Sequence, residues 1–222
     1  VDRSIIGCNG IVFLTNKVFT PSSYSSVLFP AVIDTTQFKI LSNVITNLNY
    51  DKYLNSPVSS YVFLLPTNKG MLTYIDPVSY GQTTEAVTNK TNLWEFHLDL
   101  TQKASKQLYA DVYECEILAD GSIIVGDKKN SVKGGTDNSI LKNRIEDLLD
   151  NHIVVLDENE VYDPSKKYYK TKARTFVKLE SDGSQYKVYG SYQDEVNQPI
   201  VAEAPATYNM KNGLTIPIDG VA

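Results

Sequence analysis

The chain has few of the residues on which catalytic and metal sites most often depend. Its 222 residues include two cysteines, two histidines and one tryptophan. Cys8 and Cys115 are isolated and lack the spacing of a metal-binding motif. We interpret them as two half-buried free thiols, although the sequence alone leaves a disulfide between them open.

The scarcity of histidine restricts nucleophilic catalysis. A Ser–His–Asp or Cys–His site would have to use His97 or His152, and neither lies near a Gly-x-Ser-x-Gly elbow. His152 follows a predicted helix, where a hydrogen bond commonly holds a partly buried imidazole, so we favour a structural role for it. The acidic run Asp157–Glu160 lacks the glycine and the spacing of a calcium loop. We therefore expect no catalytic residue, no metal ligand and no cofactor.

Long apolar runs and excess positive charge are also missing. No apolar run reaches the ~18 residues that indicate a membrane span. The formal net charge of -5 argues against a nucleic-acid partner, which requires a basic face. Hydrophobic content of 42% and charged content of 21% are ordinary for a soluble globular protein.

Two similar phrases, Asn9–Phe19 and Asn212–Ala222, stand near the two ends of the chain. Each has an Asn-Gly pair, an alternating apolar strand, an Asn or Asp, and a Val two residues later. Asn-Gly favours a tight turn because both residues tolerate positive φ. We interpret residues 1–20 as the terminal strand of a preceding repeat and residues 21–222 as one domain. We expect the first segment to dock on that domain as an added edge strand or to contact a second chain; an accidental similarity, with an integral strand at 1–20, is the alternative.

The order of the predicted elements indicates an α+β fold, because helical patterns come early and strand patterns dominate later. Lys128–Thr136 has no apolar periodicity and is interpreted as a polar loop. The helices are expected at residues 38–49 and 136–150, the second capped by Thr136 or Asp137. The strands are expected at residues 61–65, 93–98, 108–117, 122–125, 152–156, 175–179, 186–190 and 199–202.

Three motifs resemble those of the fasciclin-like domain family, in the family's order. Tyr61–Met71 resembles its first motif, a strand followed by Phe-Ala-Pro-Thr-Asn/Asp. Leu141–Val155 resembles its central helix, histidine and apolar strand, and Asn212–Val221 resembles its closing phrase. Asn9–Pro21 matches that closing phrase as well. The motif residues, structural in the family, are Phe63, Pro66, Thr67, Asn68, His152, Asn212, Gly213, Asp219 and Val221.

The chain departs from the family pattern at Leu65, Met71 and Asn151, where Ala, Phe and Tyr are usual. Tyr80–Thr136 is longer than the family norm and resembles an insertion, which we expect to be peripheral. This enlarged form resembles the fasciclin-like surface lipoproteins of gut Bacteroidetes. The resemblance implies a wedge of two β-sheets with short helices along one edge. It also implies an extracytoplasmic adhesion module, at the cell surface or in the periplasm, with a lipid anchor through a missing N-terminus.

The densest local feature is Lys166–Arg174, with five cations and two tyrosines in an acidic protein. One interpretation is a patch for an anionic polysaccharide, with tyrosines on sugar faces and cations on carboxylates or sulfates. The other is an edge strand that its lysines keep from pairing. The candidate binding residues are Lys166, Lys167, Tyr168, Tyr169, Lys170, Lys172 and Arg174.

The sequence therefore favours a non-enzymatic surface domain that binds a protein or a polysaccharide. Its 15 tyrosines suit exposed sheets and interfaces, where the ring is buried and the hydroxyl stays in water. Two alternatives remain open. A hydrolase or transferase would use His152 in a deep pocket, whereas a small-molecule carrier would hold its ligand in an apolar cavity between the sheets. A weak homodimer is also open.

Overall fold

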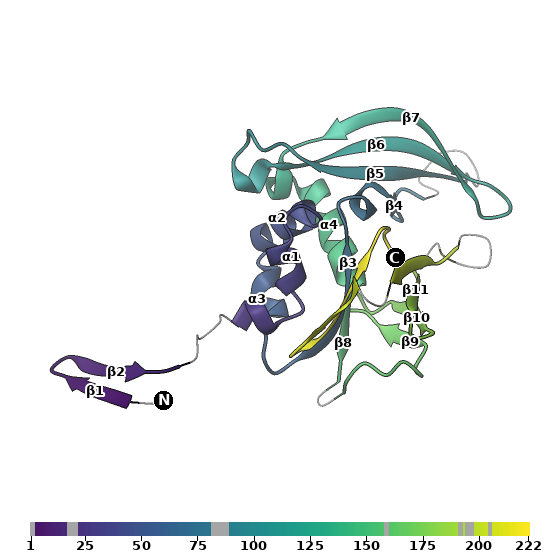
Figure 1. The fold of residues 1–222 in the computed structure, drawn as a ribbon. Coiled ribbons are helices and arrows are strands. Elements are labelled where there is room, and N and C mark those ends of the chain that lie inside the picture. Colours follow the sequence, from purple (N-terminus) through teal and green to yellow (C-terminus); the bar gives the residue numbers. More distant parts are fainter. Residues whose placement is uncertain are drawn as a thin grey trace.

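The computed structural model describes residues 3–16, 22–80, 89–157, 160–190, 193, 198–203 and 206–222. The ends of the expected segment 1–20, part of the acidic run at 158–159 and part of the insertion at 81–88 lie outside these residues. The described α-helices are α1 (Phe29–Ile33), α2 (Lys39–Asn47), α3 (Tyr50–Leu54) and α4 (Ser139–His152). Strands and short helices make the fold α+β, and this prediction is confirmed (Figure 1).

The two longer helices, α2 and α4, occur where apolar spacing predicted them. Their first N–H groups are bound by different side chains. The side chain of Asn68, distant in sequence, accepts a hydrogen bond from the Ile40 N–H in the first turn of α2 at 3.0 Å. Helix α4 begins at Ser139, after a short 3-10 turn, and the Asn138 side chain accepts from two of its first N–H groups. The predicted caps Thr136 and Asp137 are therefore wrong, because the 3-10 turn occupies those positions.

The central sheet has the order β13-β14-β3-β8 and is apolar on both faces. In β3, Tyr61, Phe63 and Leu65 face the helices, whereas Val62 and Leu64 face the second sheet. A strand that is buried on both faces has a continuous run of apolar residues in its sequence, and β3 has such a run. Its strands are β3 (Ser60–Pro66), β8 (Ile153–Leu156), β13 (Tyr208–Met210) and β14 (Gly213–Ile218), with β14 parallel to β3.

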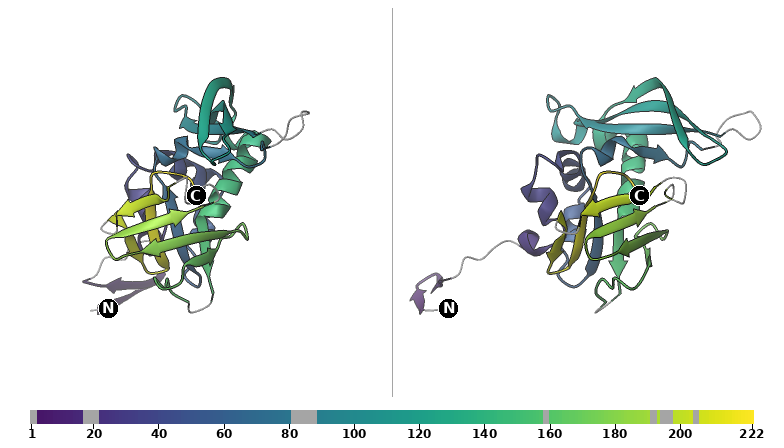
Figure 2. Two further views of the ribbon diagram at one scale, coloured as in Figure 1. Left: turned by 90° about the vertical axis from the view of Figure 1, so that its right-hand side faces the viewer. Right: turned by 45° about the vertical axis from the view of Figure 1, so that its right-hand side comes forward.

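The second sheet packs on the face of the central sheet that is turned away from the helices (Figures 1 and 2). It has the order β12-β11-β10-β9 and is antiparallel throughout. Val177, Leu179 and Val188 fill the space between the two sheets. Its strands are β9 (Tyr168–Lys170), β10 (Phe176–Ser181), β11 (Gln185–Tyr189) and β12 (Ile200–Glu203).

A third sheet, with the order β4-β5-β6-β7, covers one end of the helical layer (Figure 1). Trp94, Phe96, Leu108 and Ala110 from this sheet belong to the same core as the helices. The expectation that the insertion is peripheral is therefore wrong, because its inner face completes that core. The strands are β4 (Tyr74–Asp76), β5 (Lys90–Leu98), β6 (Leu108–Ile117) and β7 (Ile123–Val132).

A buried ion pair joins the third sheet to α4. Arg144 Nε lies 2.8 Å from Asp76 Oδ1, and only 2% of the Asp76 side chain is exposed. The Arg144 guanidinium also lies over the Trp94 ring, 5.9 Å from its centroid. A planar guanidinium suits this combination of ion pairing and aromatic contact. The ion pair thus holds β4, which pairs with β5 of the insertion, on α4, and the contact of Arg144 with Trp94 joins the insertion itself to this helix.

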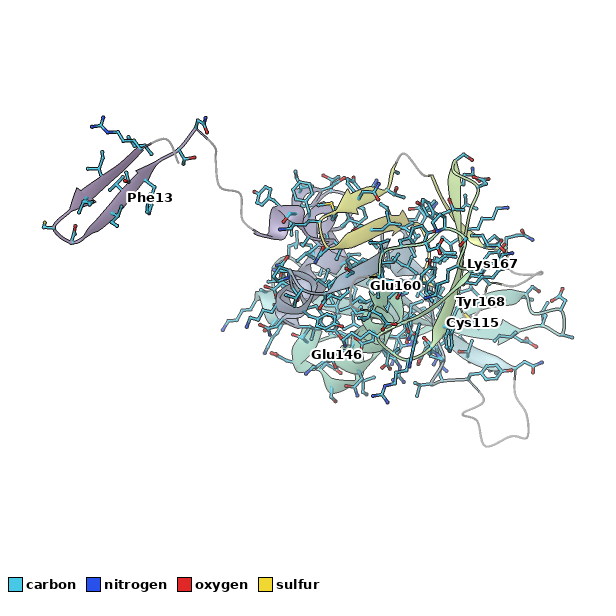
Figure 3. All side chains as sticks on the ribbon, turned by 90° about the horizontal axis from the view of Figure 1, so that it is seen from below. Phe13, Cys115, Glu146, Glu160, Lys167 and Tyr168 are labelled. Atoms are coloured by element: carbon cyan, nitrogen blue, oxygen red, sulfur yellow. The ribbon has the colours of Figure 1, made fainter. Side chains whose placement is uncertain are left out.

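The N-terminal segment forms a separate hairpin of β1 (Arg3–Gly7) and β2 (Gly10–Leu14). Within the described part of the chain these two strands pair only with each other, and they stand apart from the rest (Figures 1 and 3). The expectation of an edge strand added to the domain is therefore wrong. Every residue of the two strands is exposed.

Candidate functional site

The segment that resembles the first fasciclin motif, Tyr61–Met71, forms the junction between the central sheet and the helices. The Thr67 hydroxyl donates to Asp219 Oδ1 at 2.7 Å and accepts from the Gly70 N–H at 3.1 Å. The Asn68 side chain donates to Thr36 O at 2.8 Å, in addition to its bond with α2. These contacts link the end of β3 to the residues after β14, and they satisfy the side chains within the fold.

Asn212 and Gly213 connect the closing hairpin to the domain. The Asn212 side chain is buried; it accepts from the Val27 N–H at 2.8 Å and donates to the carbonyls of Leu54 and Ser56. Gly213 has a φ of 138°, and a Cβ built there would lie 1.9 Å from the Tyr61 carbonyl oxygen. Only glycine fits this approach of β14 to β3.

His152 is fully buried, and both of its ring nitrogens are used by the backbone. Nδ1 lies 2.7 Å from Leu148 O, and Nε2 accepts from the Ala222 N–H at 3.0 Å. Burial is the main cause of the lowering of its pKa to about 4, and the bond to Leu148 opposes it. An imidazole with both nitrogens engaged cannot take a proton from a nucleophile, so the alternative of catalysis through His152 is wrong.

The structure divides the basic run Lys166–Arg174 among different surroundings. Tyr169 is buried in the core between the sheets. Lys172 turns toward the helices, where it pairs with Asp150 at 2.5 Å and lies over Tyr50. The remaining candidates lie at the surface: Lys166 and Lys167 next to carboxylates of Glu160 and Glu180, and Tyr168, Lys170 and Arg174 exposed.

The exposed part of this run belongs to a wider aromatic surface on the outer face of the β9–β12 sheet. Lys178 in β10 pairs across the strands with Tyr168 on one side and Tyr189 on the other. Phe176 is 68% exposed and Tyr168 60% exposed. These side chains border a groove of about 480 Å³, which Pro199 and Gln198 complete. We call the surface of Tyr168, Phe176, Lys178 and Tyr189 the aromatic face; Figure 3 labels Tyr168 beside Lys167.

Cations surround the aromatic face. Lys178 Nζ lies 4.3 Å from the centroid of the Tyr189 ring and 3.0 Å from Glu180 Oε1. Its hydrogen bond to Glu180 is the main reason that the pKa of Lys178 is raised, and the same bond lowers the pKa of Glu180. Lys170 and Lys187 are exposed, and no ion pair joins either of them to another described residue. The face therefore combines flat apolar rings with charged donors.

Three members of the aromatic face, Phe176, Lys178 and Tyr189, were missed in the sequence. Their signal was present, because Asp182-Gly183 marks a hairpin turn and strand side chains alternate between faces. Counting outward from that turn places Lys178 and Tyr189 on the same face of the sheet, although the structure pairs these two residues in a register two residues away from the one that a turn at Asp182-Gly183 gives. A search for contiguous residues could not find a surface made by alternate residues of neighbouring strands.

An apolar cleft of about 350 Å³ lies beside the insertion, lined by Tyr74, Leu93, Leu148 and Val221 among others. The carrier alternative required a cavity between the two sheets of the wedge. Buried side chains fill that space instead. The cleft is therefore in a different place from the one the sequence suggested.

Other features have structural roles or none. The two cysteines are free, Cys8 exposed and Cys115 buried. Burial is the main reason that the pKa of the Cys115 thiol is raised. Among the described residues, no group of three or more His, Cys, Asp or Glu is placed to hold a metal ion. None of the described helices has the length and apolar composition that a membrane span requires.

The chain has a distant structural likeness among known proteins. No family model and no curated protein matches the chain. Among solved structures, the chain is similar to a FAS1 domain pair from the insect cell adhesion molecule fasciclin I. The identity is 10% and the TM-score 0.26, over 82% of this chain and 95% of the other. At this distance the likeness carries no argument about the site, which depends on the geometry described above.

Proposed function

We propose that the chain is a non-enzymatic, fasciclin-like binding module that acts outside the cytoplasm and holds an anionic polysaccharide on its aromatic face. The observation that carries the proposal is the exposure of Tyr168 and Phe176 on one sheet face, beside Lys178 and Tyr189. Large exposed apolar side chains gathered in a groove are typical of binding surfaces. The sequence motifs of the fasciclin-like family support the adhesive role.

The chemistry of the face suits a charged sugar chain. Aromatic rings present flat apolar surfaces to the C–H faces of pyranose rings, and the ring hydroxyls of Tyr168 and Tyr189 can form hydrogen bonds with sugar hydroxyls. Lys170 and Lys187 can pair with carboxylates or sulfates along the chain. Because the sheet is rigid and these residues lie on strands, little conformational entropy is lost on binding.

Calorimetric titration with polygalacturonate, chondroitin sulfate and uncharged dextran tests the proposal. We expect binding to an anionic polymer, weakened by added salt because exposed charges are screened. Phe176→Ala and Tyr168→Ala should each weaken it at least ~10-fold, equivalent to about 1.4 kcal/mol. Tyr80→Ala is the matched control, since Tyr80 is 51% exposed but lies outside the groove.

Two outcomes would contradict this assignment. Failure of every polymer to bind, with Phe176-dependent capture of a protein from surface extracts, would make the aromatic face a protein-binding site. Equal weakening by Tyr80→Ala and Phe176→Ala would show that binding is not located in the groove.

A further inference from the structure

The N-terminal hairpin and the hairpin that closes the domain both have a two-residue turn at the corresponding position. In β1–β2 the turn residues are Cys8 and Asn9, and Gly7 pairs with Gly10. In β13–β14 they are Lys211 and Asn212, and Met210 pairs with Gly213. In both hairpins an Asn ends a two-residue turn and a Gly begins the second strand, so residues 10–14 correspond to residues 213–217.

In the closing hairpin, each feature of this phrase has a partner. Leu214 and Ile216 are buried against the second sheet, and Thr215 is buried on the helical side, where its hydroxyl donates to Val27 O at 2.7 Å. Gly213 allows the close approach to β3, and Asn212 binds three backbone groups of the helical segment. The phrase is therefore adapted to a position between a parallel strand and a helical layer.

In the N-terminal hairpin the same features have no such partners among the residues that the structure describes. Ile11, Val12 and Phe13, which correspond to residues 214–216, are 54%, 58% and 58% exposed. Side chains on both faces of β2 are apolar, which is typical of a strand buried on both faces. Apart from its two chain neighbours, no heavy atom of a described residue lies within 4 Å of a Cβ built at Gly10. An isolated two-stranded hairpin is only marginally stable in water, so this one requires a docking partner.

We propose that β1–β2 is the closing hairpin of a second unit of this fold and docks on that unit rather than on residues 22–222. The partner surface is a parallel apolar strand of the β3 type, with a carbonyl that approaches Gly10 and backbone groups that bind Asn9. The β3 strand of this domain is not free, because β14 and β8 occupy its two edges. This proposal is independent of the polysaccharide assignment.

A transplant within the full chain tests whether β2 fits the position of β14. The chimera places the amino acids of residues 11–14, in the same order, at positions 214–217. Its substitutions are Leu214→Ile, Thr215→Val, Ile216→Phe and Pro217→Leu. The control has the same four side chains in reverse order, through Thr215→Phe, Ile216→Val and Pro217→Ile. We expect the chimera to unfold cooperatively, at a Tm at least ~5 °C above the control, because a Phe forced into the Thr215 site overpacks it.

A chimera that unfolds at or below the control would overturn the proposal. Where neither chain refolds, the single variants Ile216→Phe and Thr215→Phe decide in the same way. A second measurement uses Phe13→Asp in the otherwise unchanged chain. We expect its Tm and its mass by light scattering to equal those of the starting chain. A lower Tm would show docking on residues 22–222, and loss of a dimer would show pairing between copies; either result contradicts the proposal.

Discussion

The burial of His152 predicts a specific loss of stability between neutral and mildly acidic pH. Its pKa is lowered from 6.5 to about 4 in the folded protein, mainly by burial. Well above pH 6.5 the imidazole is neutral in both states and no stability is lost. As the pH falls, the unfolded chain binds a proton that the folded chain does not bind, and the folded state becomes less stable relative to it. This loss ends when the folded imidazole is itself protonated near its lowered pKa.

The size of the effect follows from that pKa difference. At roughly 1.4 kcal/mol for each pKa unit, the full loss is about 3 kcal/mol. Between pH 7 and pH 5 linkage predicts about 2 kcal/mol, because the unfolded imidazole is then almost fully charged and the folded one almost fully neutral. Protonation would also break the hydrogen bond from the Ala222 N–H, since Nε2 could no longer accept it.

Urea unfolding at pH 7, 6 and 5 of the original chain and of His152→Gln measures this contribution. A Gln amide can replace hydrogen bonds to backbone groups but does not titrate in this range. The variant is expected to be less stable at pH 7 and to lose about 2 kcal/mol less than the original chain on going to pH 5. Carboxylates and other groups titrate equally in both chains and cancel in the difference. Two parallel profiles, within about 0.5 kcal/mol, would refute the reasoning.

Two further substitutions, each with a control substitution, test the packing. Gly213→Ala should lower the free energy of unfolding by at least ~3 kcal/mol, because a Cβ would meet the Tyr61 carbonyl in addition to the strain of positive φ. Gly183→Ala is the control, because Gly183 also has a positive φ but a Cβ built there meets no atom within 4 Å. It should lower the free energy of unfolding only by the backbone strain, about 1 kcal/mol. Equal losses for the two variants in urea unfolding would contradict the contact with β3. Phe96→Ala should remove about 3–5 kcal/mol if the insertion shares the helical core, against less than 0.5 kcal/mol for the exposed Ile124→Ala. A small loss of stability for Phe96→Ala in thermal unfolding would show instead that the insertion is peripheral.

Local signals in the sequence account for the elements that were predicted. The Asp120-Gly121 pair predicts the turn between β6 and β7, and Gly121 has a φ of 84°. Apolar spacing predicts α2 and α4 because one face of each helix is buried. Each of these signals lies within a dozen or so neighbouring residues, which is why a single sequence suffices to find them.

The strand β7 was predicted incorrectly in part, for a physical reason. Lys128–Val132 was interpreted as a polar loop but continues the strand. It is an edge strand whose residues are almost all exposed, so neither face imposes apolar alternation. Lysines on such an edge discourage pairing with another chain. Backbone hydrogen bonds to β6, which leave no trace in side-chain polarity, hold this segment in place.

Only part of the candidate site could be predicted, because its residues come from neighbouring strands rather than from one continuous segment of the sequence. The run Lys166–Arg174 has the right composition, yet alternation along β9 sends Tyr169 inward and Tyr168 outward. Phe176 and Tyr189 reach the same face from other strands. The ion pair Arg144–Asp76 could not be predicted either, because the two residues are far apart in sequence and meet only through the packing of α4 on the third sheet.

The two Asn-Gly pairs show how structure changes the meaning of a motif. The sequence interpretation attributed them to a turn in which both residues have positive φ, but of Asn9, Gly10, Asn212 and Gly213 only Gly213 does. Asn212 is required for its bonds to the helical segment, and Gly213 for its approach to β3. A two-residue turn forms at Cys8–Asn9 without either contact. The turn alone therefore does not explain the recurrence of Asn-Gly in the N-terminal hairpin, whereas a docking surface like the one provided by β3 and the helices does.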